Sequence, residues 1–129
     1  EGKMPKDLAE FGGVLKVKVV KIDGFSDTAG FMDKTDPFVE LELGKEKYKT
    51  KVMNNAGGKA DFNEEFAFDK KEGDQTIRLK VYDSDTMSND LLGSRDIDLD
   101  DSSTGNGWYN VVKGGKETGK VLLEFSYNQ

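Results

Sequence analysis

Short stretches of the chain alternate between apolar and polar residues with a period of two. In residues 14–22, for example, lysines separate Leu15, Val17 and Val19. Because successive side chains of a strand point to opposite faces, this alternation predicts strands with one buried face. The same pattern, bounded by turn-rich segments, predicts eight strands: residues 14–22, 37–43, 47–52, 62–68, 76–82, 93–99, 108–112 and 121–127. Short strands at regular spacing, without a convincing helical stretch, predict an all-β, eight-stranded antiparallel β-sandwich.

The composition fits one folded domain with a single core. The chain has 129 residues, and its eight Phe, four Tyr and one Trp argue against disorder. Residues 1–12 are polar and mixed, so we expect a lead-in segment there and the β-sandwich domain over residues 13–129.

The residue types that are missing exclude several kinds of chemistry. The chain has no Cys and no His, which excludes disulfides, thiolate zinc sites and the commonest general base. A pair of acids could act as a glycosidase dyad, but the chain is too small to build the cleft easily. We therefore expect no enzymatic activity. The net charge of −6 argues against nucleic acid as a partner, and the absence of a signal-peptide pattern or a long apolar run predicts a cytoplasmic location.

Acidic residues gather where the predicted strands end. Asp36 precedes one strand, whereas Asp83, Asp85 and Asp90 follow another. Carboxylates at this density repel one another unless a cation lies among them. Calcium takes six to eight oxygen ligands, more than one short loop usually supplies. Two acidic loops at one end of a sandwich would therefore share a metal site.

Two other interpretations of these aspartates need to be weighed. Aspartate is common in turns and caps, where it needs no metal. An EF-hand over residues 83–94 fails, because Met87 occupies its fifth position, Ser88 replaces its turn glycine and Ser94 replaces its terminal glutamate. An isolated single-loop site is thus disfavoured.

Four motifs resemble those of C2 domains. Residues 36–39 (Asp-Pro-Phe-Val) resemble the family's Asp-Pro-Tyr-Val, and residues 62–68 resemble its Trp-Asn-Glu-x-Phe-x-Phe strand. Residues 79–93 resemble the family's third calcium loop, and residues 119–123 resemble its last strand. The motifs occur in the family's order within residues 13–127. The resemblance implies type II connectivity and a small single-domain C2 protein.

The resemblance also implies a function. C2 domains hold calcium ions between their loops and dock on phospholipid headgroups, and Asp36, Asp83, Asp85 and Asp90 match ligand positions of the family. We therefore expect calcium as the cofactor and an anionic phospholipid membrane as the partner, so that the protein is reversibly peripheral at membranes. Two calcium ions, which add four positive charges, would bring the net charge from −6 to −2.

The chain departs from the family pattern in the first loop. Gly30 stands six residues before Asp36, where the family usually has another aspartate, and Asp27 or Asp33 is the alternative ligand. The third loop is one residue shorter than usual. We therefore expect at least one calcium site to be weak or rearranged. The alternative function is a calcium-independent C2 domain that binds a protein partner.

Further residues are candidates for lipid contact. Phe31, Met32 and Met87 lie in the middle of the acidic loops, where insertion into a membrane competes with packing on the rim of the sandwich. Lys47 and Lys49 match the lysine cluster with which the family binds phosphoinositides, although alternating lysines are usually a solvated strand face.

Overall fold

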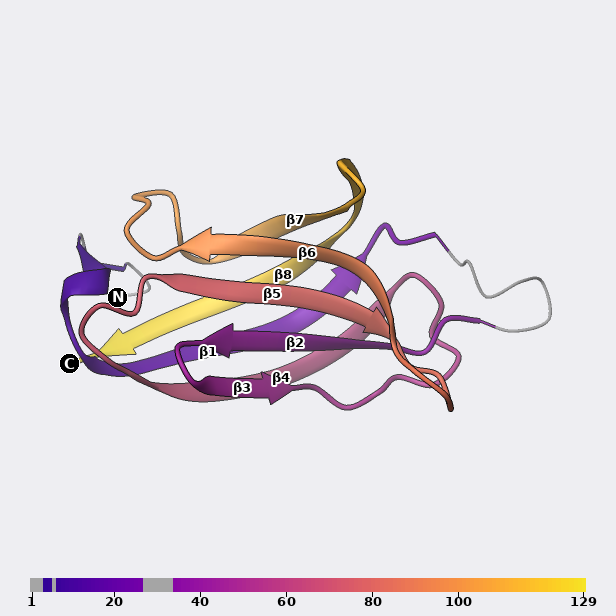
Figure 1. Ribbon diagram of the computed structural model, residues 1–129, viewed down its shortest axis with the longest axis horizontal. Coiled ribbons are helices and arrows are strands. Elements are labelled where there is room, and N and C mark those ends of the chain that lie inside the picture. The colour runs from indigo at the N-terminus through magenta and orange to yellow at the C-terminus, as the bar shows by residue number, and fades with distance from the viewer. Residues whose placement is uncertain (1–3, 6, 27–33) are drawn as a thin grey trace.

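The computed structural model describes residues 4–5, 7–26 and 34–129. Within these residues the fold is all-β, with one short 3₁₀ helix (Figure 1). The elements are η1 (Leu8–Glu10), β1 (Gly13–Asp23), β2 (Pro37–Leu43), β3 (Glu46–Lys49), β4 (Ala60–Lys70), β5 (Thr76–Asp83), β6 (Asp90–Asp98), β7 (Gly107–Lys113) and β8 (Lys116–Asn128). The prediction of eight antiparallel strands is confirmed.

The strands form one sheet that nearly closes into a barrel, in the order β3-β2-β5-β6-β7-β8-β1-β4. Figure 1 shows two layers, in which β3, β2, β5 and β6 lie over β7, β8, β1 and β4. The two layers join where Ser94 of β6 pairs with Val112 of β7. The last strand pairs with the first, Leu15 opposite Tyr127, as the expected type II connectivity requires.

The alternating apolar residues make the core between the layers. Leu41 of β2 lies opposite Leu79 of β5, and Ile77 lies opposite Ile97 of β6, all of them buried. Phe68 of β4, which is 1% exposed, belongs to the same core. Within the described ranges, no helix is long and apolar enough to cross a membrane.

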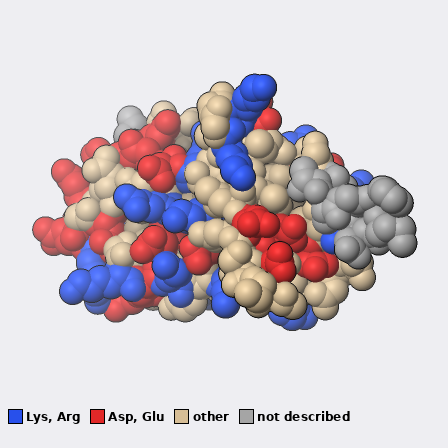
Figure 2. All heavy atoms as spheres, turned by 45° about the vertical axis from the view of Figure 1, so that its right-hand side comes forward, with Lys and Arg blue, Asp and Glu red and all other residues tan. Residues whose placement is uncertain are grey.

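The surface carries both signs of charge. Figure 2 shows blue and red side chains interspersed over the visible face. Arg78 and Asp96, for instance, lie 4.0 Å apart and are mostly exposed. Such exposed ion pairs contribute little to stability, so the core must supply most of it.

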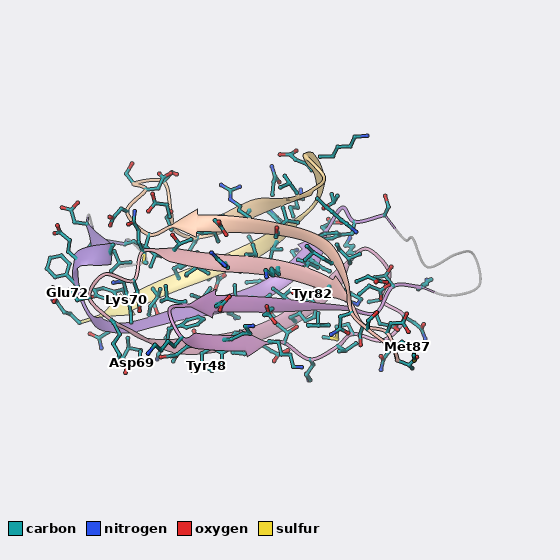
Figure 3. All side chains as sticks on the ribbon, viewed as in Figure 1. Tyr48, Asp69, Lys70, Glu72, Tyr82 and Met87 are labelled. Atoms are coloured by element: carbon teal, nitrogen blue, oxygen red, sulfur yellow. The ribbon has the colours of Figure 1, made fainter. Side chains whose placement is uncertain are left out.

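The lead-in docks on the domain. Leu8 is fully buried, while Phe11 stays 40% exposed. Lys70, at the end of β4, is also buried, and its Nζ donates hydrogen bonds to the carbonyl oxygens of Phe11 and Lys71. Figure 3 shows Lys70 at the end of the molecule that holds η1. Burial disfavours the charged amine, which lowers the pKa of Lys70.

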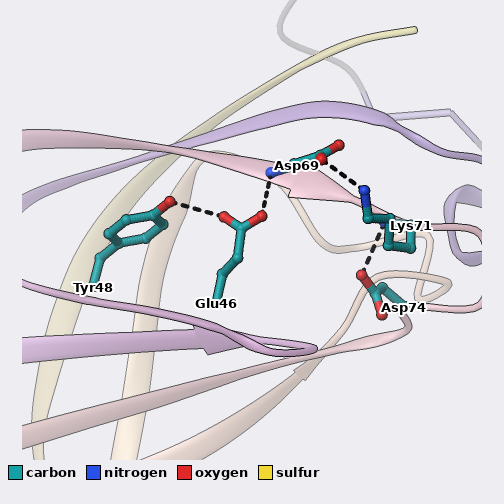
Figure 4. A network of polar contacts seen from close by, with 5 residues as sticks. All are labelled: Glu46, Tyr48, Asp69, Lys71 and Asp74. Atoms are coloured by element: carbon teal, nitrogen blue, oxygen red, sulfur yellow. Dashed lines mark hydrogen bonds and ion pairs between the residues drawn. The ribbon is translucent and has the colours of Figure 1, made fainter.

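A polar network joins β3 to β4, the two outer strands of the sheet order (Figure 4). Glu46 accepts a hydrogen bond from the Tyr48 hydroxyl (2.8 Å) through one oxygen and from the Asp69 amide N–H (2.9 Å) through the other. The bond to Glu46 raises the pKa of Tyr48. The Tyr48 ring also packs on Phe66 and Phe68, with centroids 5.5 Å and 5.0 Å away. These contacts hold the two layers together on their open side.

Strand β3 ends at Lys49, earlier than the alternation over residues 47–52 predicts. The cause is Thr50, whose buried hydroxyl accepts the Val39 amide N–H (3.0 Å) and donates to the Lys51 carbonyl (2.9 Å). The hydroxyl thus takes the place of a backbone acceptor for the Val39 N–H, while the Thr50 N–H still donates to the Val39 carbonyl oxygen (2.9 Å).

Replacing Thr50 by valine should lower the free energy of unfolding by about 1–3 kcal/mol. The substitution keeps the shape but leaves the Val39 N–H without its hydroxyl acceptor in a buried site. Urea unfolding followed by the fluorescence of the single tryptophan, Trp108, measures the change. Thr76→Val, on an exposed strand position, is the control and should change stability by less than about 0.5 kcal/mol.

Candidate functional site

The strand register brings the acidic loops to one end of the molecule. Pro37, which follows Asp36, pairs with Asp83, and Asp83 in turn pairs with Asp90. The start of β2, the end of β5 and the start of β6 therefore lie side by side, at the right of Figure 1. Figure 2, which turns this end toward the viewer, shows acidic side chains gathered there.

Asp36 and Asp83 are in direct contact. The Asp36 amide N–H donates to Asp83 Oδ1 (2.9 Å), and the Ser84 N–H donates to the Asp36 carbonyl oxygen (2.9 Å). The Asp36 carboxylate accepts a hydrogen bond from the Asn55 N–H (2.6 Å), which attaches the loop between β3 and β4 to the same rim. Backbone bonds thus fix both half-buried carboxylates where strands β2 and β5 meet.

The third loop contributes two more exposed carboxylates, Asp85 and Asp90. Asp85 Oδ1 accepts a hydrogen bond from the Thr86 hydroxyl (3.3 Å). Carboxylate oxygens are the ligands that a hard cation prefers, so the chemistry of the donors fits calcium. In residues 4–5, 7–26 and 34–129, however, no three acidic side chains lie close enough together to hold a metal ion.

The loop residues expected to contact lipid are only partly described. Asp27, Phe31, Met32 and Asp33 lie outside the described residues. Met87, at the tip of the third loop, is 91% exposed and stands at the far end of the molecule from Lys70 (Figure 3). Met87 therefore makes almost no packing contact within the domain, although acidic residues flank it in the sequence.

Lys47 and Lys49 are exposed on β3, as the alternation predicts. They lie opposite Glu42 and Glu40 of β2, and Lys49 Nζ is 5.8 Å from the centre of the Phe38 ring. The neighbouring glutamates reduce the positive potential of this strand face.

Sequence reasoning missed the residue that holds the base of the first loop, Phe25. Its ring is 8% exposed, and its N–H donates to the Gly58 carbonyl (3.3 Å). A methyl group on Gly119 would lie 2.5 Å from the Phe25 ring, and one on Gly58 would lie 1.7 Å from the Phe25 carbonyl oxygen. The available signal was an aromatic residue three positions after the end of the strand predicted over residues 14–22, at the start of a turn-rich segment.

Alanine at Gly58 should therefore displace the base of the first loop. The added methyl group meets backbone, which cannot rotate away, so we expect a loss of about 1–3 kcal/mol in unfolding free energy. Urea unfolding measures it. Gly105→Ala is the matched control, because a methyl group there has open space. Equal stability of the two variants would show that Gly58 is not a close-contact position.

Comparisons with known proteins agree with this geometry. The family model for the C2 domain matches residues 13–111. The 16 kDa phloem protein 2 of Arabidopsis thaliana is 30% identical over 120 residues, which cover 89% of this chain and 81% of that protein. The probable ADP-ribosylation factor GTPase-activating protein AGD13 of Arabidopsis thaliana is 39% identical over 93 residues, which cover 71% of this chain but 27% of that protein. Among solved structures, a C2 domain of plant Extended Synaptotagmin 1 has a TM-score of 0.76 at 26% identity, covering 89% of this chain and 93% of that one.

Proposed function

This chain belongs to the C2 domain family, and from that premise we propose that it is a calcium-dependent phospholipid-binding module that docks reversibly on anionic membranes. Its partner would be the phospholipid surface itself. C2 domains are typically non-catalytic modules, and we propose no catalytic activity for this one.

The observation that supports this function best is the joining of the two acidic loops through Asp36 and Asp83. Carboxylates on neighbouring strand ends repel each other, and a cation between them would relieve this repulsion. Asp36, Asp83, Asp85 and Asp90 would hold calcium, with Asp27 or Asp33 as a further ligand. When bound, calcium supplies positive charge and coordination positions that lipid phosphate oxygens can fill.

The chain's own residues would then make the contact with lipid. Met87, already 91% exposed, would enter the headgroup boundary, where burying such a side chain stabilises binding by about 1.5–3 kcal/mol. Phe31 and Met32 would do the same from the first loop. Lys47 and Lys49 would add a weaker contact with phosphoinositides, because Glu42 and Glu40 lie opposite them.

One observation favours a second function, a calcium-independent protein-interaction module. No group of acidic side chains in the described residues is arranged to hold a metal. Under this function the aspartates would serve only as strand-end acceptors, as Asp83 does for the Asp36 amide. Calorimetry that detects no heat with millimolar calcium, on a normally folded protein, would favour it.

Vesicle pelleting with and without calcium tests the leading proposal. We expect calcium to strengthen binding to vesicles that contain phosphatidylserine, a chelator to reduce that binding to a weaker residual level, and added salt to weaken it. Equal binding with calcium and with chelator would reject calcium dependence.

A further inference from the structure

A cavity of about 350 Å³ lies between the base of the first loop, the start of β6 and the hairpin that joins β7 to β8, and none of the candidate calcium ligands among the described residues lines it. Phe25, Leu91 and Leu92 give it an apolar wall, and Lys113, Lys116 and Thr118 bring polar groups from the hairpin between β7 and β8. Leu91 and Leu92 are half-buried at the start of β6. A cavity of this size, with an apolar wall and a few polar groups, suits part of a small ligand.

The hairpin places two lysines face to face. Gly114 and Gly115, with φ of 62° and 79°, form the two-residue turn, so Lys113 pairs directly with Lys116. Like charges at directly opposite positions destabilise a strand pair. The ion pairs among the described residues, Lys71 with Asp69 and Arg78 with Asp96, include neither lysine.

One acid shares the cavity. Glu117 also lines it, and its Oε2 accepts a hydrogen bond from the Asn110 side-chain amide (3.0 Å). With two lysines and one glutamate, the lining has a net charge of +1. The cavity is therefore a positive site in a protein whose net charge is −6.

The hairpin stands at the same end as the acidic loops. Asp23, at the end of β1, pairs with Lys120 near the start of β8, and Ser94 near the start of β6 pairs with Val112. Figure 1 shows the hairpin projecting at the end toward which the loop after β1 leads. In the same view the loop between β5 and β6 reaches the lower edge of this end, whereas the hairpin projects from the upper edge, so the two would touch a surface at separate places.

We propose that this cavity binds the headgroup phosphate of an anionic glycerophospholipid, as a contact separate from the aspartates and independent of calcium. The ammonium groups of Lys113 and Lys116 would donate to the phosphate oxygens, which removes their mutual repulsion. The glycerol and first acyl carbons would pack on Phe25, Leu91 and Leu92. One part of this proposal rests on the function proposed above, namely that the lipid comes from a membrane.

Vesicle pelleting in chelator tests this contact without the aspartate site. The double variant Lys113→Gln/Lys116→Gln should bind vesicles of phosphatidylcholine and phosphatidylserine on the order of tenfold or more weakly than the unaltered protein. The control Lys16→Gln/Lys45→Gln removes the same charge from exposed positions outside the cavity and should stay within about twofold. Equal losses in both variants, or no binding by the unaltered protein, would overturn the proposal.

The same experiment with calcium separates the two proposals. Lysine-dependent binding in chelator that calcium does not increase would reject only the calcium-dependent function. Calcium-dependent binding that the hairpin lysines do not affect would reject only this contact. Titration with short-chain phosphatidylserine should move the NMR amide signals of Gly114, Gly115 and Thr118. If inorganic phosphate alone moves them equally at equal concentration, the lipid assignment is wrong.

Discussion

Replacing Asp83 by asparagine is expected to weaken calcium-dependent binding to anionic vesicles by roughly 100-fold, because the affinity of a calcium site depends strongly on its number of charged ligands. The substitution preserves the local structure. An asparagine side-chain oxygen can still accept the Asp36 amide N–H, which Asp83 Oδ1 accepts at 2.9 Å. The fold should therefore keep its melting temperature in chelator, or gain slightly as carboxylate repulsion falls.

Asp96→Asn is the matched control for this variant. It removes one negative charge from an exposed position on β6, outside the loops, where Asp96 faces Arg78 at 4.0 Å. Vesicle pelleting at several calcium concentrations compares the two. Equal calcium dependence of the Asp83 variant and the control would show that Asp83 is not a ligand.

Replacing Phe68 by alanine is expected to lower the free energy of unfolding by about 3–5 kcal/mol. The ring is 1% exposed and contacts Tyr48 edge to face at 5.0 Å, so its removal leaves a cavity between the layers. Since small domains have a total stability of about 5–15 kcal/mol, this single change should bring the protein close to unfolding. Urea unfolding followed by Trp108 fluorescence gives the value.

Phe66→Ala provides the comparison on the same strand and face. Phe66 stacks on Tyr48 at 5.5 Å but is only half-buried, so its loss should cost about 1 kcal/mol. Similar costs for the two variants would contradict the assignment of Phe68 to the centre of the core.

The sequence predicted the parts of the fold that depend on local pattern. Alternation placed Leu41 and Leu79 on buried faces, and the structure confirms both. The alternation also placed Asp36 and Asp83 at strand ends. The resemblance to the C2 family predicted that these two ends lie together, and the hydrogen bond from the Asp36 N–H to Asp83 Oδ1 shows that they do. These features follow from strand period and from the order of the strands.

The remaining features depend on contacts between distant segments, which no local pattern records. Thr50 ends β3 because its hydroxyl reaches Val39 of a neighbouring strand. Phe25 holds the first loop through Gly58 and Gly119, which follow it by many residues. The strand β6 begins at Asp90, earlier than its apolar pattern predicts, because Asp90 and Leu91 pair with the end of β5. Loop-to-strand contacts of this kind decide the shape of the candidate site.

Thermal unfolding during a calcium titration tests most directly whether the joined loops hold a cation. An ion that binds only the folded state raises its stability, by about 2.7 kcal/mol at a hundredfold excess over the dissociation constant. We predict that the melting temperature rises with calcium in the unaltered protein and does not rise in Asp83→Asn. A melting temperature that millimolar calcium leaves unchanged in the unaltered protein would contradict a shared cation site between Asp36 and Asp83.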